Sequence, residues 1–115
     1  LNSESIIKLG KYNKLKQGTL VQELKTRLLN GELLFMHQLQ TNNVIEFINL
    51  DVPGQDMATN IWKEGGGHAT TIVEVTQYGL VVSSWGSRYL IKFSDLADNN
   101  FEIYALKISD INSQK

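Results

Sequence analysis

The stretch HATTIVEVTQYGLVVSSWGSRYLIKF, residues 68–93, decides the fold of this chain. It holds three runs rich in β-branched and aromatic residues, at 68–75, 79–85 and 87–93. Gly79 opens the second run after the short segment 76–78, and Gly86 separates the second run from the third. Strands joined by such short connections pair as antiparallel hairpins. The stretch therefore predicts three consecutive antiparallel strands, the first two connected by a turn near Gln77.

A helix is predicted upstream, in GTLVQELKTRLLNG (18–31). Thr19 is expected to cap it, because Gln22 follows three residues later in a capping-box pattern. Asn30-Gly31 supplies the stop signal. The apolar positions repeat at helical spacing and predict a stripe that faces the core, made of Leu20, Val21, Leu24, Leu28 and Leu29.

The remaining segments complete an α+β chain, with one helix followed by a mostly antiparallel β-sheet. Further strands are expected at 32–37, 43–52 and 101–108. The polar, glycine-rich segment 55–67 is expected to be a loop. SDLA (94–97) is expected to form one helical turn capped by Ser94.

Length and composition indicate one soluble domain over residues 1–115, with the compartment left undetermined. The formal net charge is −1, so no overall charge attracts nucleic acid. No run approaches the ~20 apolar residues of a membrane span. The chain has no cysteine, which excludes disulfides, thiolate metal sites and a cysteine nucleophile of its own.

The residue pattern gives little support for a metal site or for a phosphate-binding loop. The two histidines, His37 and His68, are far apart and belong to no ligand cluster, so no metal and no cofactor is expected. Glycines 65–67 lead into a strand, whereas a phosphate-binding loop leads into a helix. The strand carboxylates alternate with apolar residues and are expected to face solvent at Glu46, Glu74 and Glu102.

Nucleophilic catalysis remains as a function for His68. A histidine at the start of a strand, reached through glycines, can be held rigidly as a general base if a third group fixes its tautomer. The predicted hairpin could bring Ser83 or Ser84 beside it. The alternative from spacing alone is a structural histidine at a strand end.

Two segments, GGGHATTIVEV (65–75) and GLVVSSWGSRYLI (79–91), resemble the C-terminal half of papain-like cysteine peptidases. They are also similar to the bacterial C39-like branch of that superfamily. The helix-glycine-strand segment VQELKTRLLNGELLFM (21–36) resembles the unit that precedes the histidine in this family. The resemblance covers residues 19–108, which leaves 1–18 as an N-terminal extension and 109–115 as a tail.

The resemblance implies a role for each matching residue. His68 matches the general base, Ser83 the Asn or Asp that orients it, and Trp85 the aromatic side chain that shields the pair from water. Gly86 matches the turn glycine, and the other site-shaping positions are Gly66, Gly67 and Ser84. Two departures stand out: the nucleophilic cysteine is absent, and serine replaces the orienting residue at position 83.

Three hypotheses follow. The chain is the C-terminal part of a papain-like cysteine hydrolase whose nucleophile lies on a preceding segment that the given sequence does not include. Alternatively, it is a catalytically inactive domain of this fold that binds a peptide or protein partner. The third possibility is a coincidental resemblance in a small α+β interaction domain.

Overall fold

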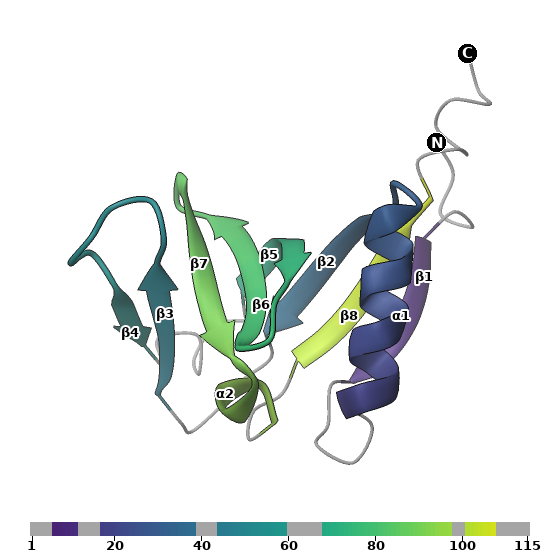
Figure 1. Ribbon diagram of the computed structural model, residues 1–115, viewed down its shortest axis with the longest axis horizontal. Coiled ribbons are helices and arrows are strands. Elements are labelled where there is room, and N and C mark those ends of the chain that lie inside the picture. Colours follow the sequence, from purple (N-terminus) through teal and green to yellow (C-terminus); the bar gives the residue numbers. More distant parts are fainter. Residues whose placement is uncertain (1–5, 12–16, 39–43, 60–67, 98–100, 108–115) are drawn as a thin grey trace.

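The computed structural model describes residues 6–11, 17–38, 44–59, 68–97 and 101–107. Within these ranges, eight strands form a single antiparallel sheet in the order β1-β8-β2-β5-β6-β7-β3-β4, with one long helix and one short helix (Figure 1). The elements are β1 Ile6–Lys11, α1 Gln17–Leu29, β2 Leu33–Gln38, β3 Ile45–Asn49, β4 Met57–Thr59, β5 His68–Val75, β6 Gly79–Ser84, β7 Ser87–Lys92, α2 Phe93–Ala97 and β8 Phe101–Leu106. The α+β class predicted from the sequence is confirmed.

The three strands of the 68–93 stretch form two consecutive hairpins, as the sequence predicts. β5 pairs antiparallel with β6 from Val75↔Leu80 to Thr71↔Ser83, and β6 pairs with β7 over its whole length. Thr76 closes the first turn, because its hydroxyl oxygen accepts the N–H groups of Tyr78 and Gly79, both at 3.1 Å. The β-branched runs and their short connections predicted both pairings, but not the register shift between Ile72 and Glu74.

The end of α1 follows the sequence prediction, but its start does not. Gly31, with φ of +80°, closes a Schellman motif in which Gly31 N–H donates to the carbonyl of Leu28 and Glu32 N–H to that of Arg27, both at 3.0 Å. The helix begins at Gln17, so the predicted cap at Thr19 is wrong. Thr19 lies inside the first turn. Ser94 is likewise inside α2, which begins at Phe93.

One face of the sheet and the apolar side of α1 form the core. Leu24 of α1 is fully buried, and Leu20 and Leu28 pack against the same cluster. Leu29, which the helical spacing places in this stripe, is instead 88% exposed at the end of the helix. The sheet contributes alternate residues to the core, among them Leu34, Met36, Ile72, Leu80, Val82, Tyr89, Ile91, Ile103 and Ala105.

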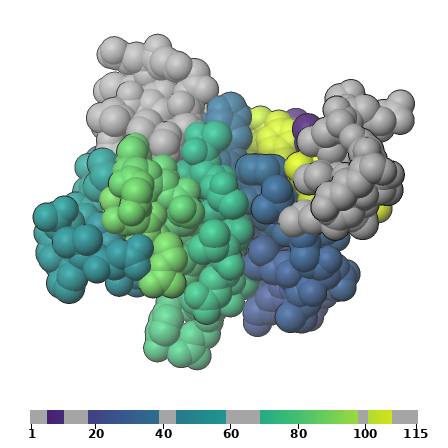
Figure 2. Space-filling model, turned by 90° about the horizontal axis from the view of Figure 1, so that it is seen from above, coloured from purple at the N-terminus to yellow at the C-terminus, as the bar shows by residue number. Residues whose placement is uncertain are grey.

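Two strands appear where none was expected. β1 lies within the predicted N-terminal extension and pairs with β8 at one edge of the sheet, where a register shift occurs between Lys8 and Gly10. β4 lies within the predicted loop 55–67 and pairs with β3 at the opposite edge. Figures 1 and 2 show this β3–β4 pair beside β7 at one end of the molecule. Edge strands this short or irregular carry little hydrophobic periodicity.

Glu102 corrects a second expectation from the sequence. Its position in β8 is only 8% exposed, whereas Glu46 and Glu74 are exposed as expected. An ion pair with Lys8 of β1 compensates the buried carboxylate. The hydrogen bond and the charge of Glu102 raise the pKa of the Lys8 ammonium above its ordinary value. The edge strand β1 therefore brings the counter-ion that strand alternation alone does not reveal.

Candidate functional site

His68 is the first residue of β5, and its Cα partner on the neighbouring strand is Gln38 of β2. The strand that follows the glycines is therefore present as predicted. Gly66 and Gly67 lie outside the described residues, and His68 is described by its backbone alone. The rigid placement of His68 as a general base stays a prediction.

Ser83 lies opposite Thr71 in the β5–β6 ladder, three residues from His68. At about 3.3 Å per residue, three positions correspond to roughly 10 Å along the strand. This register does not favour a direct contact between Ser83 and the imidazole. The Ser83 side chain is exposed, and that of Ser84 is half-buried. The orienting role of Ser83 stays a prediction, and the register weakens it.

Trp85 and Gly86 form the two-residue turn between β6 and β7, flanked by the pair Ser84↔Ser87. Both residues have positive φ, +49° for Trp85 and +78° for Gly86, as a type I′ hairpin turn requires. The expected role of Gly86 as a turn glycine is thus seen in the backbone. A tryptophan in this conformation is unusual and costs of order 1 kcal/mol.

The Trp85 ring stacks edge-on against two aromatic side chains. Its centroid lies 5.4 Å from that of Phe47 and 5.5 Å from that of Tyr89, at interplanar angles of 68° and 86°. Edge-to-face contacts of this kind each contribute about 0.5–1.5 kcal/mol. These contacts offset the strain of the turn, while 41% of Trp85 stays exposed. The turn therefore presents an anchored aromatic surface close to the end of β6.

Asp51 and Arg88 fix the neighbouring loop against the β6–β7 hairpin. The Asp51 carboxylate accepts the backbone N–H of Arg88 at 2.8 Å and the guanidinium Nε and Nη2 at 3.0 and 2.8 Å. These hydrogen bonds, first the side-chain bond and then the backbone bond, lower the pKa of Asp51. A backbone hydrogen bond adds to these contacts: Leu50 N–H donates to the Arg88 carbonyl at 2.9 Å. The loop after β3 is thereby attached to the strand that follows Trp85.

Gln38 and Thr70 form a polar pair within the core face of the sheet. Gln38 is 2% exposed and Thr70 is 6% exposed. Among the described residues, neither the amide oxygen and nitrogen of Gln38 nor the hydroxyl of Thr70 has a hydrogen-bond partner. Our reading of the sequence missed this pair. The alternation Leu34, Met36, Gln38 was the available signal, since period two assigns all three to one face.

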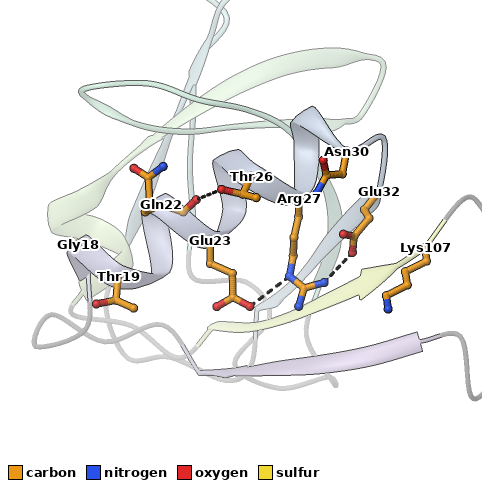
Figure 3. A pocket seen from close by; sticks show the side chains of 9 residues that line it. All are labelled: Gly18, Thr19, Gln22, Glu23, Thr26, Arg27, Asn30, Glu32 and Lys107. Atoms are coloured by element: carbon orange, nitrogen blue, oxygen red, sulfur yellow. Dashed lines mark hydrogen bonds and ion pairs between the residues drawn. The ribbon is translucent and has the colours of Figure 1, made fainter.

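A groove of about 720 Å³ lies along α1, away from the β5–β7 strands (Figure 3). Its centre is Arg27, which pairs with Glu32 at 2.7 Å and with Glu23 at 3.2 Å. Burial lowers the pKa of Arg27, but the two ion pairs outweigh this and leave it raised. Lys107 adds a further cation to the lining. The lining holds two cations, Arg27 and Lys107, against two carboxylates, Glu23 and Glu32, and is neutral overall.

The described part of the chain contains no group of three or more histidine, cysteine or carboxylate side chains that could hold a metal ion. Neither helix in the same ranges has the length and apolarity needed to cross a bilayer. No family model, no curated protein and no solved structure matches this chain. The site must therefore be interpreted from its own residues.

Proposed function

We propose that this chain is the histidine-bearing part of a papain-like cysteine hydrolase, in which His68 acts as the general base. The observation that carries the proposal is the pairing of two strands. β5, which begins at His68, pairs antiparallel with β6, which ends in the Ser83-Ser84-Trp85-Gly86 segment. The sequence resemblance joins the same two segments.

The proposed reaction cleaves a peptide, isopeptide or other amide bond. His68 takes the proton from a cysteine thiol on a segment outside the given sequence, and the thiolate attacks the substrate carbonyl carbon. The carbon–nitrogen bond breaks as the imidazolium returns the proton to the leaving amine, which leaves a thioester. His68 then activates a water molecule that hydrolyses the thioester and restores the thiol. No cofactor takes part.

The test uses the complete gene product, including any residues encoded before Leu1, and a peptidyl vinyl sulfone that alkylates activated thiols. We expect one cysteine to be labelled in the natural protein and labelling to fall at least about 100-fold in His68→Ala, the lower range for loss of a general base. His37→Ala is the matched control, because it removes the other histidine of the 115-residue sequence. Equal labelling in all three proteins, or a product without a cysteine, would overturn the proposal.

A second candidate is an inactive domain that binds an extended peptide. The observation that favours it is the combination of an absent cysteine with a Ser83 placed opposite Thr71 instead of His68. Among the described residues β4 pairs with β3 alone, so its other edge could accept a peptide strand. Its partner strand β3 carries Phe47, which contacts Trp85. Titration with synthetic extended decapeptides should then shift the Trp85 indole N–H resonance. An unchanged resonance at millimolar peptide would count against binding.

A further inference from the structure

A β-bulge near the end of β5 brings an apolar side chain to the surface. Ile72 and Glu74 are two positions apart in β5, but their partners in β6, Val82 and Val81, are adjacent. One residue of β5 is therefore extra to the ladder, as in a β-bulge. That residue is Val73, which pairs with no residue of β6 and is 43% exposed.

The bulge also keeps a carboxylate out of the core. Ile72 belongs to the core, and strict alternation would place Glu74 on the same face. The shifted register instead places Val75 opposite the fully buried Leu80, where it packs against the core. Glu74 is exposed. This end of β5 therefore presents one aliphatic side chain and one carboxylate at the surface.

A groove of about 350 Å³ lies between this end of β5 and α1. It is lined by Lys25, Leu28 and Leu29 of α1 and by Val73, Glu74 and Val75 of β5. Leu29 is 88% exposed, although leucine is among the residues most often buried. The same surface thus carries an apolar hollow and a protruding leucine at its rim.

The two walls of this groove carry one charge each, of opposite sign. Lys25 lies on the helix and Glu74 on the strand. Both are exposed, and within the described ranges neither belongs to an ion pair. A partner with charges of one sign, such as a nucleic acid, would repel one of the two. A second copy related by a two-fold axis would instead bring a lysine to each glutamate.

We propose that this groove is an interface between two copies of the chain, related by a two-fold axis. Leu29 of each copy inserts between Leu28 and Val73 of the other. Lys25 of each copy pairs with Glu74 of the other. Because every contact of a two-fold interface occurs twice, one patch supplies both the protruding and the receiving side. The patch is small for a protein–protein interface, so the dimer is weak and reversible.

The first test is the molar mass of the 115-residue chain in solution. Sedimentation equilibrium covers protein concentrations from about 10 µM to about 1 mM, the range in which weak complexes form. We expect the mass to rise from monomer towards dimer. Leu29→Lys should raise the dissociation constant at least about 30-fold, as expected for a residue at the centre of an interface. Val44→Lys is the matched control: it adds the same charge at an exposed aliphatic residue beside β3, and should change nothing.

The second test exchanges the two charges. Lys25→Glu and Glu74→Lys should each weaken the dimer about five-fold or more, because each change places like charges opposite each other twice. The double variant restores opposite charges and should dimerise like the natural chain. An equimolar mixture of the two single variants should associate more tightly than either variant alone. In the mixed dimer, two glutamates of one copy meet two lysines of the other.

The outcome does not depend on the proposed hydrolase activity, because the measurement requires neither His68 nor a cysteine. A chain that stays monomeric at about 1 mM would overturn the inference and leave the groove to a partner of a different kind. A dissociation constant that Leu29→Lys leaves unchanged would also overturn it. A mixture that associates no more tightly than its two components would do the same.

Discussion

Gly79 of β6 and Ile91 of β7 approach so closely that residue 79 has no room for a side chain. A Cβ atom on Gly79 would overlap the carbonyl oxygen of Ile91 and lie 2.9 Å from the Cα atom of Lys92. The sequence identifies Gly79 only as a break between two strands. The structure shows that the close approach of β7 also excludes every larger residue.

Gly79→Ala should therefore destabilise the fold by about 3 kcal/mol, at the upper end of overpacking effects, because both neighbours are rigid backbone. The measurement is the free energy of unfolding in urea. Gly18→Ala is the matched control, since a Cβ at this position in α1 would meet nothing within 4 Å. That change should be neutral or stabilising by up to about 1 kcal/mol. Similar effects of the two substitutions would contradict the close approach.

Replacing Gln38 by methionine should raise the free energy of unfolding by about 1–2 kcal/mol, since the change removes an unsatisfied buried amide and keeps its volume. Gln22→Met, at an exposed position on α1, serves as the control and should change stability by less than about 0.5 kcal/mol. A less stable Gln38→Met protein would mean that the amide has a strong partner in the fold.

The strongly periodic parts of the sheet could be predicted from the sequence, and its edges could not. β5 was predicted with its observed bounds, and β6 and β7 to within one residue, because β-branched runs between glycines favour only one pairing. β1 and β4 depend on neighbouring strands for their hydrogen bonds. Leu29 shows a related limit: helical spacing places it in the apolar stripe, but as the last residue of α1 it is exposed.

The candidate site was less predictable than the fold, because a site depends on register across strands. The motif indicated His68 and the Ser83–Gly86 segment: His68 begins β5, Ser83 and Ser84 end β6, and Trp85 and Gly86 form the turn that follows. The residue opposite His68 follows from a pairing between β2 and β5, whose partners are about 30 positions apart in sequence. No local pattern contains that information. Period-two alternation assigns Gln38 to the core face, but its partners across the sheet are known only once the strands are paired.

Two substitutions of Trp85 separate the contribution of its ring contacts from the strain of its positive φ. Trp85→Ala and Trp85→Asn both remove the ring contacts with Phe47 and Tyr89, and both should lower the free energy of unfolding by about 2 kcal/mol or more. Asparagine tolerates positive φ better than alanine does, so Trp85→Asn should be the more stable of the two by about 0.5–1 kcal/mol. Thermal and urea unfolding measure both values. Equal stabilities would mean that the turn is not strained at this residue.

The Asp51–Arg88 pair should make stability depend on pH in the acid range. The hydrogen bonds from Arg88 lower the folded-state pKa of Asp51, whereas the carboxyl of the unfolded chain keeps its ordinary pKa of about 3.9. A lowered folded-state pKa means that the stabilisation is fully present above about pH 4–5 and is lost as the pH falls through the folded-state value. The contribution is small, because both side chains are substantially exposed.

Asp51→Asn should therefore be less stable than the natural protein at neutral pH, and the difference should shrink as the pH falls below 4. Urea unfolding at neutral and acid pH measures the gap. Arg88→Gln removes the other partner and should give the same convergence, and the double variant should lose little beyond either single change. A gap that stays constant down to pH 2 would mean that Asp51 titrates alike in the folded and unfolded chains.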